Sequence, residues 1–258
     1  MNRLPRHAGK PRQNPATSPL RLAGTLLAGA ALLTLAGCFD EAEDQANDQV
    51  EQMIVAQAEQ PAEQTAKSAA VDAPAAQGSV DVAKLMDTQP LPDVVVGDAD
   101  APVTIVEYAS LTCSHCADFH AETLPVVMKD YVDTGKAKFI LREFPFDPLA
   151  LSGFMLARCA PGDRRTAMTD VLFEQQDTWA RAEKPSVALL QLAKLAGFTQ
   201  DTFTQCLNDK DLQGKVMEVQ KAGESFGVNA TPTFFINGDK YAGALSPDEM
   251  SAVLDAHL

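Results

Sequence analysis

The hydrophobic pattern divides the chain into three stretches. An apolar run extends from Leu22 to Gly37, and the part from Phe39 to about Gln89 is rich in Ala, Gln, Asp and Glu. From Leu91 to Leu258, apolar positions recur at strand and helix spacings. Because only the last stretch can bury a core, we expect one folded domain at residues 91–258, preceded by a solvated tether.

The folded stretch begins with a predicted strand, helix and strand. The β-branched run from Val103 to Ser110 predicts a core strand. Apolar residues at helical spacings predict a helix from Cys113 to about Tyr131, which Pro125 should kink. A second strand is predicted from Lys138 to Phe144.

A block of helices should follow the second strand. Residues 149–226 fit four or five helices, with Ser186 and Thr199 as cap or first-turn residues. The breaks between the helical patterns lie at Pro161-Gly162, Lys184-Pro185, Gly197 and Gly214. This block interrupts the alternation of strands and helices, so we interpret it as an insertion.

The chain should close with a hairpin and a helix. Thr233–Ile236 and Lys240–Ala244 predict two strands, and Asn237-Gly238 between them is a turn signal. A terminal helix is predicted from Pro247. The complete order indicates an α/β fold with an inserted helical block.

The N-terminal apolar run is typical of a signal peptide, residues 1–37. It follows a basic start and is shorter than the roughly 20 residues of a membrane span. It ends in Leu35-Ala36-Gly37-Cys38, which resembles the bacterial lipobox. That resemblance implies a lipid on Cys38 and an anchor to a membrane of the bacterial cell envelope, on its periplasmic side. The alternatives are ordinary cleavage after Ala28-Gly29-Ala30 and an uncleaved anchor with an unmodified Cys38.

The predicted tether, residues 38–90, has one competing interpretation. Asp48 to Gln60 places Val50, Met53 and Ile54 on one face of a short helix. Such a helix would be an oligomerisation element. Three apolar residues are weak support, so a solvated tether is favoured.

The net charge argues against a protein that binds nucleic acid. The chain has 21 Lys+Arg and 35 Asp+Glu residues, for a formal charge of −14. Phosphate backbones are bound by basic surfaces. Hydrophobic residues make up 46% of the chain, which is enough to form a core.

Cys113 and Cys116 are separated by two residues and lie where the first predicted strand gives way to a helix. This spacing allows the sulfurs to form a disulfide or a dithiol. Unsatisfied N–H groups at the helix N-terminus stabilise a thiolate more at Cys113 than deeper in the first turn. Cys113 is thus the predicted nucleophile and Cys116 the resolving thiol. His115 between them is expected to lower the pKa of Cys113 further.

The run Tyr-Ala-Ser-Leu-Thr-Cys-Ser-His-Cys-Ala-Asp-Phe-His, the late Thr231-Pro232-Thr233 and the strand order resemble the DsbA-like branch of the thioredoxin superfamily. The resemblance covers about Pro92 to Leu258. It implies a thioredoxin-like fold, thiol:disulfide oxidoreductase activity and a cis Pro232 that pairs with a substrate peptide. Ser114 stands where this family typically has Pro, so the redox potential does not follow by analogy.

The resemblance also implies how a substrate is bound. Thr231 would face the sulfurs and tune substrate release. We expect a shallow apolar groove around Leu111, Phe119, Thr231 and Pro232 that accepts unfolded chains without reading their sequence.

Glu107 lies inside the first apolar strand, where the resemblance places a buried acid beneath the active site. A buried carboxylate could accept the proton of Cys116 during exchange. The alternative is a glutamate at a strand edge that points to solvent.

A metal site is the chemical rival at this motif. Cys113, His115, Cys116 and His120 are four ligand types within eight residues. There is no second pair of cysteines at this spacing, and cysteine pairs in exported proteins more often perform redox chemistry than bind zinc. We therefore expect no metal and no cofactor, and we place His120 on the helix surface.

Cys159 and Cys206 remain once Cys38 is lipidated and the Cys113/Cys116 pair is redox-active. An even remainder in an oxidising compartment predicts a structural disulfide between them, contributing about 3 to 4 kcal/mol. Two buried free thiols are the alternative.

Three functions remain for testing. The leading prediction is an enzyme that donates disulfides to unfolded or reduced exported proteins and is reoxidised by a DsbB-like quinone-linked membrane oxidase. The second is an isomerase or reductase kept reduced by a membrane electron donor. The third is a tethered chaperone or binding module.

Overall fold

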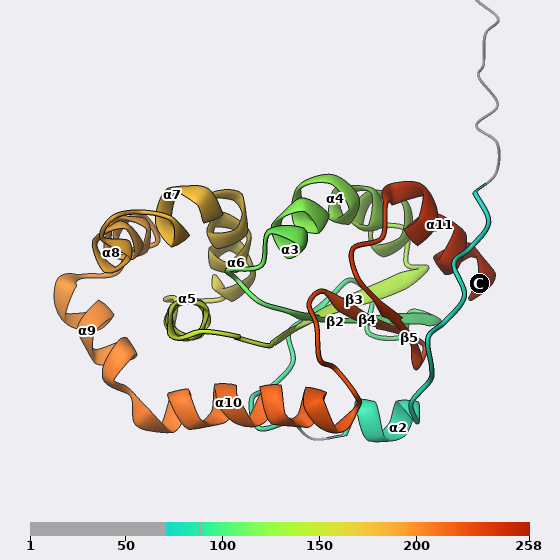
Figure 1. Cartoon of the computed structure of the whole chain (residues 1–258), viewed down its shortest axis with the longest axis horizontal. Coiled ribbons are helices and arrows are strands. Elements are labelled where there is room, and N and C mark those ends of the chain that lie inside the picture. The colour runs from blue at the N-terminus through green and yellow to red at the C-terminus, as the bar shows by residue number, and fades with distance from the viewer. Residues whose placement is uncertain (1–70, 88) are drawn as a thin grey trace, which may run out of the picture. The chain divides into compact units, whose positions relative to one another are not determined.

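The computed structural model describes residues 71–258 with the exception of residue 88 (Figure 1). The predicted signal peptide, Cys38 and the helix at Asp48 to Gln60 lie outside the described residues. In the described range, no helix is both long enough and apolar enough to cross a membrane.

The described strands form one mixed sheet in the order β1-β3-β2-β4-β5. Their bounds are Val95–Val96, Val103–Ala109, Ala137–Glu143, Thr233–Ile236 and Asp239–Ala242. Strand β2 is central, parallel to β3 and antiparallel to β4, and every residue in it is buried. It is buried on both faces because α3, α4 and α11 lie on one side of the sheet and α2 and α10 on the other (Figure 1). The α/β prediction is therefore confirmed, and β1 is a strand that the pattern did not predict.

The helix after β2 is irregular. It runs through α3 (Ser114–Asp118), the π-helical η1 (Phe119–Thr123), α4 (Leu124–Val127) and the π-helical η2 (Met128–Val132). Pro125 stands in the first turn of α4, where a missing N–H is tolerated. The predicted helix is thus present, but π-helical turns on both sides of α4 break its regular geometry.

The helical block contains six helices in the described part of the chain, more than the four or five predicted. They are α5 (Pro148–Cys159), α6 (Arg165–Glu174), α7 (Gln176–Ala180), α8 (Pro185–Leu195), α9 (Gln200–Asn208) and α10 (Lys210–Ser225). Gln175 separates α6 from α7, and Asp209 ends α9 while capping α10, both without Gly or Pro. Gly214 was expected at a break but lies inside α10.

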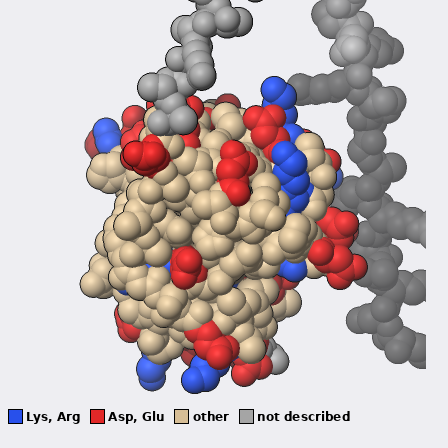
Figure 2. Space-filling view, turned by 90° about the vertical axis from the view of Figure 1, so that its right-hand side faces the viewer, with Lys and Arg blue, Asp and Glu red and all other residues tan. Residues whose placement is uncertain are grey.

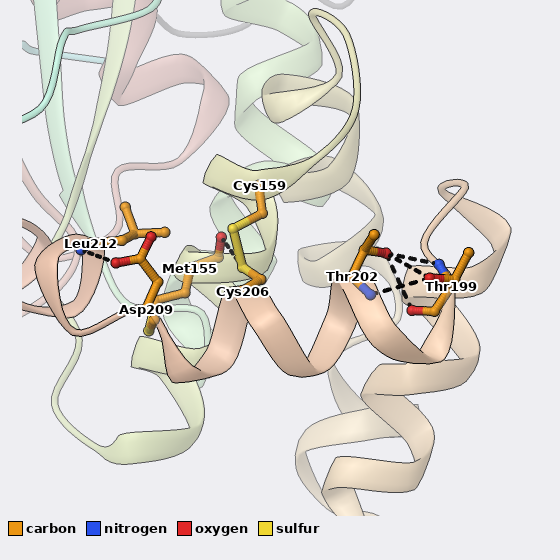
Figure 3. The surroundings of a disulfide bond; sticks show 7 residues. All are labelled: Met155, Cys159, Thr199, Thr202, Cys206, Asp209 and Leu212. Atoms are coloured by element: carbon orange, nitrogen blue, oxygen red, sulfur yellow. Dashed lines mark hydrogen bonds between the residues drawn. A yellow bond between two sulfur atoms is a disulfide. The ribbon is translucent and has the colours of Figure 1, made fainter.

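Cys159 and Cys206 are joined by a disulfide that links the end of α5 to α9 (Figure 3). The Cys206 sulfur is 3.1 Å from the carbonyl oxygen of Met155. Thr199 caps α9 through a reciprocal pair of hydrogen bonds with Thr202. Helices α5 and α9, which this disulfide links, also pack against each other.

The C-terminal hairpin and helix follow the prediction closely. Asn237 and Gly238 both have positive φ, as a tight turn between β4 and β5 requires. Helix α11 (Pro247–Ala256) is capped by Ser246, whose side chain accepts a hydrogen bond from the Glu249 amide. The hairpin thus places β4 beside the central strand β2 and β5 at one edge of the sheet.

The packed domain begins before the predicted boundary at Leu91. Ser79 bridges to Asp239 of β5, and helix α2 (Val82–Leu85) follows. Leu85 is only 1% exposed and packs in a core cluster on the side of the sheet that α2 and α10 cover. A Cβ on Gly238 would lie 2.6 Å from the Val80 carbonyl oxygen, so this turn needs glycine. The later part of the predicted tether therefore belongs to the domain, because one buried leucine and a strand edge hold it.

Figure 2 shows the end of the molecule that faces right in Figure 1. Uncharged residues cover most of this face, and acidic side chains are interspersed with basic ones.

Candidate active site

The two cysteines lie where β2 ends and the irregular helix begins. Cys113 is the extended N-cap residue of α3, is partly buried, and follows the buried Ser110 and Leu111. Cys116 is in the first turn and is fully buried. Both thiols are free in the structure. One sulfur is accessible to a partner and the other is sheltered behind it.

The environment gives the two thiols opposite acidities. A hydrogen bond from the Cys116 thiol, against partial burial, lowers the pKa of Cys113 to about 5. Thr231 and the backbone N–H groups of Cys116 and His115 lower the pKa of Cys113 further. Burial, the bond to Cys113 and the charge of Glu107 raise the pKa of Cys116 far above its ordinary value. Cys113 is therefore a stable thiolate and Cys116 a protonated thiol at neutral pH.

The loop before β4 lies against the nucleophile. The Thr231-Pro232 peptide bond is cis, which is the geometry that the resemblance implied. The Cys113 sulfur is 3.3 Å from the Thr231 carbonyl oxygen, to which it donates a hydrogen bond only when it is protonated. The Thr231 hydroxyl is buried and has no nitrogen or oxygen partner in the described part of the chain, and its hydrogen bond to the Cys113 sulfur lowers the pKa of that thiol. Thr231 thus faces Cys113 with both its backbone and its side chain.

Two sets of side-chain hydrogen bonds that hold the active-site loop were not predicted from the sequence. The Gln176 side-chain amide of α7 donates to the carbonyl oxygens of Leu111 and Cys113, each at 2.9 Å. Thr112 donates to Asp147, which also caps α5. Asp147 before Pro148 carries a cap signal in the sequence, but no local pattern indicates that Gln176 reaches the loop. The helical block therefore helps to hold the redox site.

Glu107 is fully buried beneath the site, so the alternative of a solvent-facing glutamate is wrong. Its Oε2 lies 2.9 Å from Nε2 of His120. The expectation of a surface His120 is also wrong, because its side chain is only 6% exposed. The π-helical turn η1 and the stacking of the imidazole on Phe173 hold His120 in the interior.

Other predicted site residues lie differently from the expectation. Leu111 and Phe119 are 0% and 1% exposed, so they belong to the core and cannot line a surface groove. Pro232 is buried as well. His115 is exposed, and its backbone N–H is the group that acts on Cys113. A role for the His115 imidazole stays a prediction.

A groove of about 720 Å³ does lie beside the active site, but other residues form it. It separates the irregular helix from α6 and α7 and includes Ser114 next to the nucleophile. Among the described residues, no three His, Cys, Asp or Glu side chains converge on a position for a metal ion.

The sequence is similar to proteins of the thioredoxin superfamily. Residues 88–256 match a family model described as thioredoxin. The "Putative protein-disulfide oxidoreductase" of Rickettsia felis is 35% identical over 173 residues, covering 64% of this chain and 60% of the relative. Disulfide bond formation protein D of Bacillus subtilis is 27% identical over 173 residues, covering 64% of this chain and 76% of that protein. The chain therefore spans about three fifths of the length of its Rickettsia relatives.

A solved structure gives the same assignment. The crystal structure of Wolbachia pipientis α-DsbA1 has a TM-score of 0.61 and 34% sequence identity, covering 67% of this chain and 94% of that chain. The fold is thus thioredoxin-like, with the helical block inserted between β3 and β4. The family match extends over more than half of the chain, and the match to α-DsbA1 includes nearly all of that protein. The chain therefore belongs to the DsbA-like branch of the thioredoxin superfamily.

Proposed function

We propose that this protein is a thiol:disulfide oxidoreductase that donates disulfides to exported proteins through Cys113 and Cys116. The observation that carries the proposal is the low pKa of Cys113, about 5, beside a protonated Cys116. A stable thiolate favours the reduced form, which makes the disulfide form a stronger oxidant. The similarity to proteins named as disulfide oxidoreductases supports the same chemistry.

The reaction starts from the Cys113–Cys116 disulfide. A substrate thiolate attacks the Cys113 sulfur, a mixed disulfide forms, and Cys116 leaves with the electron pair. A second thiolate of the substrate attacks the substrate sulfur of the mixed disulfide and releases Cys113 as a thiolate. The substrate loses two electrons to form its disulfide, and the cysteine pair gains them. Partial exposure of Cys113 and burial of Cys116 support this order of attack.

The cellular setting is part of the proposal. A lipid on Cys38 anchors the protein on the periplasmic side of a membrane, where unfolded or reduced exported proteins are its substrates. A DsbB-like quinone-linked membrane oxidase regenerates the disulfide. The lipobox-like sequence before Cys38 supports the anchor. The second candidate is an isomerase or reductase kept reduced by a membrane electron donor. Thr231 favours it, because its position before the cis proline resembles that of a threonine in isomerase relatives.

The deciding experiment is the equilibrium reduction potential of the Cys113/Cys116 pair in glutathione buffers, measured on the full chain. DsbA and thioredoxin differ by about 150 mV, so the two classes are well separated. We expect a value near the oxidising end of this range. A value near the reducing end would reject the disulfide donor and leave the reductase. A Cys113→Ser variant that retains full function in cells would reject both enzymes and leave a binding module.

A further inference from the structure

A buried ionisable pair lies behind the redox cysteines. Glu107 and His120 are joined at 2.9 Å, and their side chains are 0% and 6% exposed. Glu107 Oε1 has no hydrogen-bond partner in the described part of the chain, so this oxygen is free to accept a proton. Glu107 also acts electrostatically on the Cys116 thiol. The pair is therefore coupled to the group that must gain and lose a proton in each cycle.

The imidazole of His120 is held between elements. It stacks on Phe173 of α6 with ring centroids 4.0 Å apart and an interplanar angle of 26°. Phe119 and Phe139 contact it edge-on. Three phenylalanine rings and a carboxylate fix its orientation, and the π-helical turn η1 directs it inward. Such turns occur frequently at functional sites.

His120 connects this interior to the groove. Together with Asp170 of α6, it lines both the groove of about 720 Å³ and a second cavity of about 100 Å³. Asp170 is exposed to solvent. Protein atoms around the Asp170 carboxyl raise its pKa and the charge of His120 lowers it, so the two groups interact. The other charged residues that line these cavities are Asp118, Arg165, Glu174, Asp177 and Arg181.

We propose that Glu107, His120 and Asp170 form a proton path from Cys116 to the groove. In this path, His120 carries the proton past the phenylalanine rings that surround it. The proposal rests on the proposed disulfide exchange at Cys113 and Cys116, and it assigns a role to His120. Imidazole suits this position because it accepts a proton on one nitrogen and releases one from the other near neutral pH.

The path balances the protons of the exchange. When a substrate thiolate opens the disulfide, Cys116 leaves as a thiolate and takes up one proton, which arrives through Asp170, His120 and Glu107. Cys113 stays a thiolate after the second attack. When the pair is reoxidised, Cys113 first forms a mixed disulfide with the oxidant. Cys116 then gives its proton to the path, attacks the Cys113 sulfur and expels the oxidant's thiolate.

The test separates these two steps of reoxidation. The reduced full chain is mixed with excess glutathione disulfide, and samples are quenched in acid and weighed by mass spectrometry. The first step adds one glutathione to Cys113 and depends on the Cys113 thiolate alone. The second step releases that glutathione and requires deprotonation of Cys116. The first step therefore serves as an internal control for the second.

His120→Gln retains a hydrogen-bond donor for Glu107 but cannot carry a proton near neutral pH. We expect the second step to slow by about 10-fold or more at pH 7, in line with the usual contribution of general acid–base catalysis. The first step should stay within about twofold of wild type. His257→Gln is the matched control, since His257 also lies near a carboxylate, Asp239 at 3.8 Å, but outside the site. It should leave both steps unchanged.

Chemical rescue gives a readout that a purely structural role would not move. His120→Ala opens space beside the groove, and added imidazole should accelerate its second step selectively. If His120→Ala does not fold, His120→Gln alone decides the question. A second step within twofold of wild type in His120→Gln, an equal slowing of both steps, or a folded His120→Ala without imidazole rescue would overturn the proton path. Failure of the wild type to release glutathione would instead reject the proposed function.

Discussion

Cys113 and Cys116 occupy one helical turn, yet their surroundings lower the pKa of Cys113 and raise the pKa of Cys116. Cys113 is partly exposed and receives hydrogen bonds that stabilise its thiolate, whereas Cys116 is buried near the carboxylate of Glu107. The largest single cause of the low pKa of Cys113 is the hydrogen bond from Cys116. The nucleophile therefore depends more on its partner thiol than on any other neighbour.

Replacing the partner thiol tests this dependence. Cys116→Ala removes the hydrogen bond to the thiolate, so the pKa of Cys113 should rise from about 5 towards its ordinary value, by roughly one unit or more. The rate of alkylation by iodoacetamide as a function of pH measures it. An unchanged midpoint would contradict the assignment. His115→Ala retains the backbone N–H, so a rise in the midpoint would support the predicted role of the imidazole, and an unchanged midpoint would assign the effect to the backbone alone.

The sequence was sufficient to find Cys113, Cys116 and Pro232, because their spacing and neighbours form recognisable motifs. It was not sufficient to place His120, since helix periodicity assumes regular turns. The π-helical turn η1 changes which side of the helix each residue occupies. An aromatic partner from α6 then completes the pocket. Both facts depend on tertiary structure.

Helix α10 crosses beneath the central strand at a glycine. A Cβ on Gly223 would lie 2.7 Å from the Tyr108 ring, closer than side chains tolerate. Gly214 in the same helix is exposed and has nothing within 4 Å of such a Cβ. One glycine thus permits close packing on the sheet, and the other only weakens the helix.

These two glycines form a matched pair for mutation. Gly223→Ala should lower the free energy of unfolding by about 1 to 3 kcal/mol because it overpacks the contact with Tyr108. Gly214→Ala should raise it by up to about 1 kcal/mol because alanine favours the helix. Urea denaturation measures both. Similar effects of the two substitutions would show that α10 does not pack closely on Tyr108.

At the scale of elements, prediction succeeded where a segment carries its own pattern. The core strand was found because its β-branched residues are continuous, and α11 because Pro247 marks its start. Strand β1 was missed because two residues carry no periodicity and are held only by pairing with β3. The boundary between α9 and α10 was missed because it relies on Asp209 as a cap.

Across the whole molecule, Glu143 ties the sheet to the helical block. It lies at the end of β3, is fully buried, and binds Arg158 of α5 and Arg165 of α6 at 2.6 and 2.8 Å. Burial raises the pKa of Glu143, but the two arginines outweigh burial and hold that pKa below its ordinary value of 4.5. The carboxylate stays ionised because two cations share it.

Glu143→Gln should destabilise the protein by about 3 to 5 kcal/mol near neutral pH, because it leaves two largely buried arginines without their anion. The stability contributed by the ionised carboxylate is present above pH 4.5 and is lost as pH falls through the lower folded-state pKa. The difference from wild type should therefore shrink in acid, as measured by denaturation between neutral and acid pH.

Asp211→Asn is the control for this prediction, since it breaks the exposed pair with Lys215. It should leave stability nearly unchanged, because exposed ion pairs are screened by water and contribute little. A difference between Glu143→Gln and wild type that stays constant down to the lowest pH would contradict the role of the ionised carboxylate.

The segment before Leu91 has a consequence for solubility. Gln77 and Val80 donate backbone hydrogen bonds to Lys240 and Gly238, so they shield the outer edge of β5. Unshielded strand edges recruit other chains into intermolecular sheets. A chain shortened to start at Leu91 would lose these backbone hydrogen bonds to β5. It would also lose Leu85, which would expose part of the core cluster on the side of the sheet that α2 covers. It should therefore aggregate edge to edge at concentrations where the longer chain stays monodisperse.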